Sequence, residues 1–267
     1  MVEGTDMTVR VYAIASGKGG TGKTTTTLNL GASLAILGKK AIVVDADIGM
    51  ANLGLLVGLE NSKITLHEVL SGEAEIKEAI YNGPSGLKVV PSGLSLKGFQ
   101  KSNPDKLKQV IPVLSQGMDY VLIDAPAGIS KDGLIPLCVA DRILLVVNPD
   151  LSSLADAIKT KTLAELLGKT VEGVILNCTK LEKTEINRNK VQELLGVQVL
   201  ETIPEDANVR HSAALKIPVV ARIPNSPASI AFRRLAARIA GEKFIEPKET
   251  RSFFGFAKKI FGGKKTE

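Results

Sequence analysis

Short apolar runs alternate with longer amphipathic segments along most of the chain. The runs are rich in β-branched residues, and most of them do not alternate polar with apolar positions, which is typical of parallel strands covered on both faces. The predicted strands are residues 9–15, 41–45, 87–91, 120–124, 143–147, 174–177 and 198–203. The predicted helices include residues 23–38, 104–115 and 151–167, and a final helix that begins near Ser226-Pro227 and ends at Gly241. This order predicts an α/β fold with a doubly wound, mostly parallel sheet and helices on both faces.

Composition excludes several classes of protein. Of the 267 residues, 44% are hydrophobic and 23% are charged, which excludes a disordered or fibrous chain. The longest uncharged stretch, residues 24–38, is shorter than the roughly 20 residues that span a bilayer, so we expect no integral membrane segment. The first eight residues hold two acids and no secretory signal, so we expect a cytosolic chain. Cys138 and Cys178 lie far apart, which excludes a CxxC redox pair and favours buried free thiols.

A glycine-rich segment directly follows the first predicted strand and leads into a helix. Its sequence, Gly17-Lys18-Gly19-Gly20-Thr21-Gly22-Lys23-Thr24, fits the phosphate-loop pattern G-x-x-x-x-G-K-[ST]. The glycines let backbone N–H groups point inward at an anion, and the helix N-terminus adds its dipole. Lys23 is expected to contact the β- and γ-phosphates, and Thr24 to offer its hydroxyl to Mg²⁺. The predicted phosphate contacts are Gly17, Gly19, Gly20, Thr21, Gly22, Lys23, Thr24 and Thr25.

A second lysine at the loop entrance narrows the class of protein. The run from Lys18 to Thr24 resembles the pattern K-G-G-x-x-K-[ST] of the deviant Walker A P-loop ATPases, the MinD/ParA family. In that family the first lysine reaches the nucleotide of a partner subunit. The resemblance therefore implies an ATP-dependent homodimer in which Lys18 acts catalytically in trans, with a purely local role for Lys18 as the alternative.

Acidic residues close two further predicted strands, at the sheet edge where ligands of doubly wound sheets bind. The segment 45–52 resembles the first switch of the family, which implies that Asp47 orients the attacking water, Asp45 lies near the water shell of the metal, and Asn52 lies at the dimer face. A structural role, in which one carboxylate caps the next segment, is the alternative. The segment 124–128 resembles the Walker B and second-switch region, which implies that Asp124 holds a magnesium-bound water and that Gly128 approaches the γ-phosphate.

The identity of the nucleotide base, adenine or guanine, is predicted less directly. GTPases read guanine with N-K-x-D, and the matching strand end here, Asn177-Cys178-Thr179-Lys180, lacks the aspartate, so ATP is preferred. The resemblance places the adenine near Asn177 and the loop Pro204-Glu205-Asp206.

The end of the chain differs from the rest. Residues 251–265 contain five bases and no acid, and they hold four of the seven phenylalanines. If this segment is helical, its apolar side chains form one stripe bordered by lysines, which is typical of a helix that lies in a lipid interface. The predicted membrane contacts are Phe253, Phe254, Phe256, Lys258, Lys259, Ile260 and Phe261. Docking of the stripe on the protein's own surface is the alternative.

These patterns divide the chain into an ATPase domain at 1–241, a polar linker at 242–250 and an amphipathic basic tail at 251–267. The tail resembles the membrane-targeting helix of MinD proteins within the family. This implies a Mg²⁺-dependent ATPase, slow without an activator, that dimerises with ATP and binds the inner face of the cell membrane reversibly while it positions a division site, another assembly or a cargo protein.

Two alternative functions belong to other classes. In the first, the protein is a ParA-like partition ATPase that binds nucleic acid non-specifically through Arg222, Arg233, Arg234 and Arg238. In the second it is an iron–sulfur carrier of the same superfamily, which the two isolated cysteines disfavour.

Overall fold

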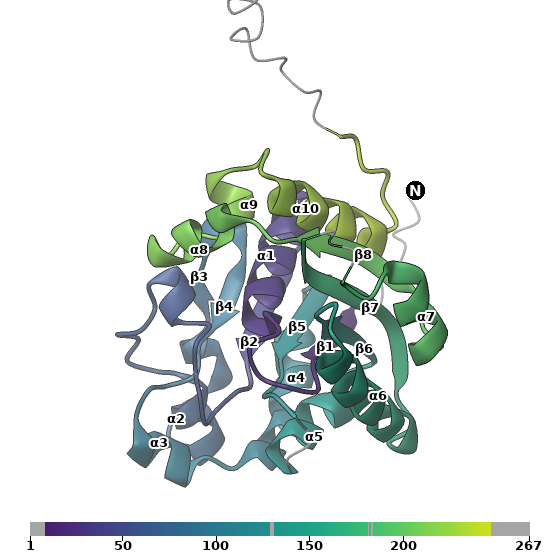
Figure 1. Ribbon diagram of the computed structural model, residues 1–267. Coiled ribbons are helices and arrows are strands. Elements are labelled where there is room, and N and C mark those ends of the chain that lie inside the picture. The colour runs from purple at the N-terminus through teal and green to yellow at the C-terminus, as the bar shows by residue number, and fades with distance from the viewer. Residues whose placement is uncertain (1–8, 129–130, 181, 183, 247–267) are drawn as a thin grey trace, which may run out of the picture.

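The computed structural model describes residues 9–128, 131–180, 182 and 184–246 (Figure 1). Within these residues, eight strands form one sheet in the order β3-β4-β2-β5-β1-β6-β7-β8. The strands are β1 (Arg10–Ala15), β2 (Ala41–Asp45), β3 (Tyr81–Asn82), β4 (Lys88–Val90), β5 (Tyr120–Asp124), β6 (Arg142–Val147), β7 (Thr170–Thr179) and β8 (Val199–Pro204). All neighbours are parallel except β3 and β4. The predicted doubly wound sheet is confirmed, and only the short antiparallel β3 was not predicted.

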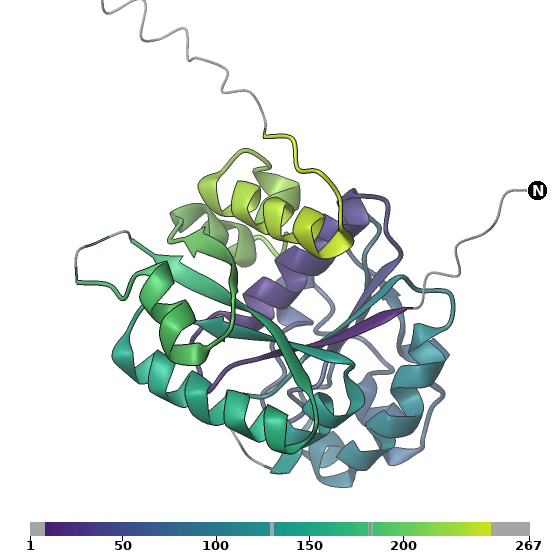
Figure 2. The ribbon, with the colours of Figure 1, turned by 90° about the vertical axis from the view of Figure 1, so that its right-hand side faces the viewer.

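Helices cover both faces of the sheet (Figures 1 and 2). They are α1 (Lys23–Ile36), α2 (Leu66–Ser71), α3 (Leu96–Lys101), α4 (Leu107–Ser115), α5 (Lys131–Val139), α6 (Leu151–Leu166), α7 (Arg188–Leu195), α8 (Ala207–Ala214), α9 (Val219–Arg222) and α10 (Pro227–Ala240). The predicted helix 104–115 is divided into a 3₁₀ turn, Pro104–Lys106, and α4. As predicted, α10 starts after Ser226, whose side chain caps the helix, and stops at Gly241, which has a φ of 71°.

Two hydrophobic cores sandwich the sheet. Alternate residues of β1 face opposite sides, so Val11 and Ala13 pack with α4, α5 and α6, whereas Tyr12 and Ile14 pack with α1, α9 and α10. In a doubly wound sheet, ligands bind at the loops that follow the carboxyl ends of the strands. The phosphate loop lies at that edge, between β1 and α1.

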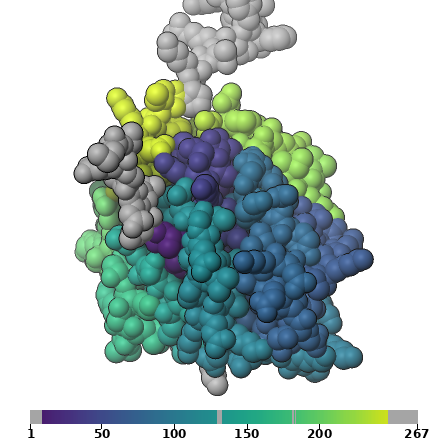
Figure 3. Space-filling view, turned by 180° about the vertical axis from the view of Figure 1, so that it is seen from behind, coloured from purple at the N-terminus to yellow at the C-terminus, as the bar shows by residue number. Residues whose placement is uncertain are grey.

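The start of the predicted linker packs against the domain. Glu242 pairs with Lys39 at 2.6 Å, and Arg234 of α10 contacts both the ring of Phe244 and the Glu246 carboxylate, the latter at 2.7 Å. In Figure 3 the end of α1, in purple, accordingly lies beside the yellow segment that follows α10. The predicted tail, 251–267, lies outside the described residues. Within the described ranges, no helix combines the length and the apolar composition needed to cross a bilayer.

Candidate functional site

The phosphate loop connects the end of β1 to the N-terminus of α1. Gly22 caps α1 with a φ of 88°, and no side chain bonds to the first N–H groups of the helix, so they remain available to an anion. A Cβ at Gly22 would lie 2.3 Å from the Asn177 side chain, and one at Gly17 would lie 2.2 Å from the backbone of Asp156. The loop therefore needs glycine at these positions because other elements approach its backbone closely.

Lys23 projects from the loop into a buried acidic environment. Its residue is 8% exposed, and burial lowers the pKa of the ammonium group while Asp124 and Asp47 raise it. Lys23, Asp47 and Asp124 thus lie close together in the structure, although they are far apart in the sequence. A buried cation at the N-terminus of a helix is suited to bind a phosphate group.

Asp45 and Asp124 lie side by side on neighbouring strands. They are register partners on β2 and β5, and they are 0% and 1% exposed. Asp45 accepts hydrogen bonds from the backbone N–H groups of Leu53 (3.1 Å) and Asp47 (3.3 Å), and Asp124 accepts one from the Thr27 hydroxyl (3.1 Å). Burial raises the pKa of both carboxyl groups, to about 6 for Asp124 and well above the ordinary range for Asp45.

The Asp45–Asp124 pair is suited to a site that binds a divalent cation. Two buried carboxylates repel each other, and a nearby positive charge relieves the repulsion. Asp124 also accepts a hydrogen bond from Thr24, the residue predicted to bind Mg²⁺. Among the described residues, no group of three or more His, Cys, Asp and Glu side chains is arranged to hold a metal. Thr24 and the two aspartates would therefore hold the ion together with the phosphate oxygens of the nucleotide and water.

The raised pKa of Asp124 predicts how the stability of the ligand-free protein varies with pH. Between about 4, where an unfolded aspartate loses its proton, and about 6, the folded protein binds more protons than the unfolded chain. The contribution of Asp124 to the free energy of unfolding should therefore fall as pH rises through this window. Asp124→Asn should flatten that fall, as measured by urea midpoints at closely spaced pH values. If the urea midpoints of wild type and Asp124→Asn changed in parallel with pH, Asp124 would not have the raised pKa.

The first-switch turn begins at Asp47, which is half-buried. Its carboxylate accepts a hydrogen bond from the Met50 backbone N–H at 3.1 Å, and burial raises its pKa. Asn52 is exposed and donates to the Met50 carbonyl at 2.8 Å. In the second switch, the Gly128 N–H donates to the Ser16 carbonyl at 3.2 Å, with a φ of 81°. Both switches thus border the phosphate loop.

Lys18 forms an ion pair within its own chain. Its Nζ lies 3.0 Å from a carboxylate oxygen of Asp150, which also caps α6 by accepting from the Ser153 N–H. This is the local arrangement that the sequence left open, and the role in trans stays a prediction.

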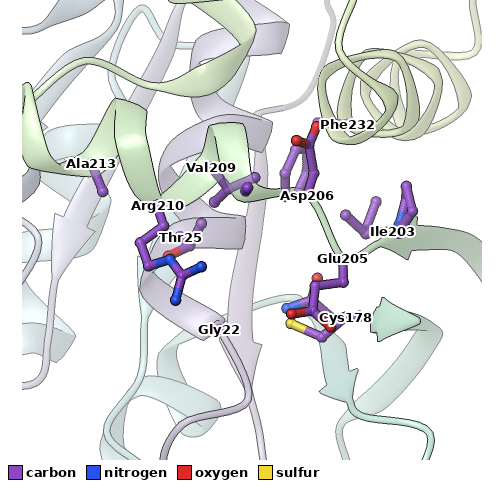
Figure 4. Close-up of a pocket in the computed structure, with 13 residues that line it drawn as sticks. Gly22, Thr25, Cys178, Ile203, Glu205, Asp206, Val209, Arg210, Ala213 and Phe232 are labelled. Carbon is purple, nitrogen blue, oxygen red and sulfur yellow. The ribbon is translucent and has the colours of Figure 1, made fainter. Parts of the chain in front are cut away.

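A cavity of about 410 Å³ adjoins the loop (Figure 4). All four predicted adenine contacts, Asn177, Pro204, Glu205 and Asp206, line it together with Gly22 and Thr25. The Asn177 amide donates to the Thr21 carbonyl at 2.8 Å, which ties the end of β7 to the phosphate loop. Volume and lining are suited to a nucleoside, because such sites enclose several hundred Å³ and hold a few polar groups. The expectation of two buried thiols is wrong: Cys178 is exposed and lines this cavity, and Cys138 is only half-buried.

Comparison with known proteins decides the family. The model of the CobQ/CobB/MinD/ParA nucleotide binding domain matches residues 12–219 of this chain. The chain belongs to the MinD/ParA family. This confirms the resemblance seen in the phosphate loop, and the matched nucleotide binding domain contains the site described above.

Individual members of the MinD/ParA family resemble the chain over nearly its whole length. An uncharacterized ATP-binding protein of Methanocaldococcus jannaschii is 44% identical, covering 94% of this chain and 96% of its own. The septum site-determining protein MinD of Pyrococcus horikoshii, solved with Mg-ADP, is 36% identical with a TM-score of 0.83, covering 86% and 96%. The MinD-like chain of the MinC:MinD cell division protein complex of Aquifex aeolicus is 32% identical to this chain, with a TM-score of 0.80. The match covers 90% of this chain and 99% of that chain.

Sequence reasoning missed several residues of this MinD/ParA site. Thr27 bonds to Asp124, and Phe232 closes the cavity from α10. The guanidinium of Arg210 on α8 extends toward Thr25 and Gly22 (Figure 4). Thr27 was detectable because it lies one helical turn after Lys23, and Arg210 because it follows Asp206, the cap of α8, by one turn. Phe232 carried no signal beyond that of a core position.

Proposed function

We propose that the protein is an ATP-hydrolysing switch of the MinD type that dimerises with ATP and binds membrane reversibly through its carboxy-terminal segment. Membership of the family supports a nucleotide-driven ATPase. The similarity to septum site-determining MinD proteins supports a role in division-site or other spatial positioning. The observation that carries the proposal is the convergence of Lys23, Asp47 and Asp124 at a phosphate loop whose neighbouring cavity accepts a nucleoside.

Each residue of the site has its own role in the proposed hydrolysis of ATP. Lys23 and the loop N–H groups hold the phosphates, and Mg²⁺, when bound with ATP, supplies the charge that offsets the phosphates and aspartates. In this proposal Asp47 orients the attacking water; its half-buried carboxylate lies near enough to Lys23 to raise the pKa of the lysine, which supports that role. Gly128 connects the second switch to the loop backbone, so the γ-phosphate can order both switches.

A dimer would give Lys18 a second partner. Its ion pair with Asp150 is partly exposed, at 31% and 47% for the two side chains, and such pairs contribute only about 0–1 kcal/mol. Lys18 can therefore leave Asp150 at little cost and contact the phosphates of a second subunit. The structure of a MinC:MinD complex supports partner proteins as a further feature, including an activator or a cargo that binds the dimer.

The membrane proposal rests on the composition of the tail. Each buried phenylalanine contributes about 1.5–3 kcal/mol, and each lysine near an anionic surface adds about 1 kcal/mol, while ordering the helix opposes both. A single tail therefore binds weakly. Two tails in one ATP-bound dimer bind far more strongly because the second insertion is intramolecular. The proposal therefore includes a peripheral location on the inner face of the cell membrane.

Deleting residues 251–267 should abolish ATP-dependent sedimentation with anionic phospholipid vesicles and leave ATP affinity within about twofold. Truncation after Phe261 is the matched control, because it keeps the apolar stripe. Wild type should sediment with ATP and much less with ADP. Equal sedimentation of the deletion variant, or nucleotide-independent sedimentation of the full chain, would exclude this mechanism.

Three of the four arginines of the nucleic-acid alternative have partners in the domain. Arg234 pairs with Glu246 and Glu201, Arg238 donates to the Leu200 carbonyl at 2.8 Å, and Arg222 donates to the Ser212 hydroxyl. These contacts hold α9 and α10 in place. ATP-dependent, salt-sensitive DNA binding by the tail-deleted protein would nevertheless favour the partition function.

A further inference from the structure

A buried histidine connects the first-switch turn to the helices behind it. His67, the second residue of α2, is 1% exposed, and its Nε2 lies 3.0 Å from the backbone carbonyl oxygen of Ile48. Ile48 directly follows Asp47. The imidazole therefore contacts the backbone one peptide unit away from the residue predicted to orient the attacking water.

The chemistry of this contact determines the tautomer. A carbonyl oxygen only accepts, so Nε2 carries the proton and donates, and Nδ1 of the neutral ring is an acceptor. Nδ1 is buried and has no hydrogen-bond partner among the described residues. Its surroundings are tight: a Cβ added at Gly93 or at Gly98 would lie 2.6 or 2.8 Å from Nδ1. Both glycines thus leave just enough room for the ring, whose Nε2–H points to Ile48.

Other contacts hold the same turn from the sheet side. Asp45 accepts from the Asp47 N–H, and the Ile48 side chain is buried in the core shared by β2 and α2. On the solvent side, the Asp47 carboxylate accepts from the Met50 N–H. The Ile48 carbonyl belongs to the Ile48–Gly49 peptide, which lies inside the turn that the Asp47–Met50 hydrogen bond closes, so its orientation constrains that turn and the Asp47 side chain at its start.

We propose that His67 is a positioning residue for ATP hydrolysis, which holds the Ile48 carbonyl and thereby the Asp47 carboxylate in the orientation that aligns water. This inference rests on the proposed ATPase function. It assigns to α2 a role in catalysis, although α2 lies behind the site and His67 itself contacts neither the phosphate loop nor the nucleotide cavity. Loss of the Nε2–H should therefore affect the chemical step and spare nucleotide binding.

The test uses replacements that differ in where they place a donor. Glutamine can bring its amide nitrogen close to the position of Nε2, whereas methionine fills similar space without a donor, and asparagine places its donor near Nδ1. In the full-length protein, His67→Met and His67→Asn should lower the single-turnover rate constant of ATP hydrolysis, and with it kcat, by about tenfold or more, because small displacements of a catalytic group cost that much. His67→Gln should retain most of the wild-type rate, and ATP Kd should change by less than about twofold in all three.

The control is His211→Met, the same replacement at an exposed histidine of α8, with thermal midpoints recorded for every variant. If His67→Met does not fold, the His67→Asn and His67→Gln pair decides. Wild-type kcat in the variants that lack the donor, or equal losses of kcat in His67→Gln and His67→Asn, would overturn the positioning role. A loss of ATP affinity in proportion to kcat would also overturn it, as a general structural defect. Failure of the wild-type protein to hydrolyse ATP would instead overturn the proposed function.

Discussion

Replacement of Lys23 by alanine is expected to weaken nucleotide binding by about two orders of magnitude or more. The ammonium group is buried at the N-terminus of α1, and a charge-assisted hydrogen bond to phosphate contributes about 1.5–3 kcal/mol, with further loss because the phosphates would face Asp45, Asp47 and Asp124 without it. We expect ATP Kd to rise by about 100-fold or more. Titration of a fluorescent ATP analogue and isothermal calorimetry measure this directly.

The matched control for this prediction is Lys190→Ala, which removes an exposed lysine of α7 that pairs with Glu193. It should leave ATP affinity unchanged, since α7 lies away from the loop. Folding is checked by the thermal midpoint, which reports the balance between the cost of burying the ammonium group and its attraction to Asp124 and Asp47. Binding of ATP by Lys23→Ala within a few-fold of wild type would show that another group holds the phosphates.

Replacement of Asp47 by alanine is expected to separate binding from hydrolysis. The Asp47 side chain lies on the switch turn and not on the phosphate loop, so ATP affinity should be preserved. The rate of hydrolysis should fall by about 10²–10⁴-fold, the range associated with loss of a general acid–base group. The variant should then accumulate as an ATP-bound dimer, which size-exclusion chromatography with light scattering detects, and its vesicle binding should persist.

Asp47→Asn distinguishes the catalytic role from the capping role. Asparagine can still accept from the Met50 N–H, so it preserves the turn, but it lacks the negative charge that orients and polarises a water molecule. A catalytic Asp47 predicts that both variants are slow. Near-normal hydrolysis by Asp47→Asn together with slow hydrolysis by Asp47→Ala would assign the residue a structural role only. Asp105→Ala, at an exposed aspartate paired with Lys108, is the control.

Much of the fold was predictable because the strands are buried on both faces. Every predicted strand is present, with ends that differ by a few residues, and β7 extends from Thr170 because its first residues pair with β6 outside the purely apolar run. The short β3 was not predictable, since Tyr81 and Asn82 have no strand-like periodicity and pair only because the chain turns back beside β4. The docked start of the linker was missed for a similar reason, because Glu242, Phe244 and Glu246 find their partners only after α1 and α10 have packed together.

The sequence by itself determined the local chemistry: the phosphate loop from Gly17 to Thr24, the family that this loop indicates, and the acidic residues at the strand ends. Such features depend on a few consecutive residues whose backbone preferences are intrinsic. Only the tertiary structure decided which of them meet. It placed Asp45 beside Asp124, gave Lys18 the partner Asp150, and set His67 behind Ile48. Those contacts join residues from 19 to 132 positions apart, and strand register and helix packing, which no local pattern encodes, bring them within hydrogen-bonding distance.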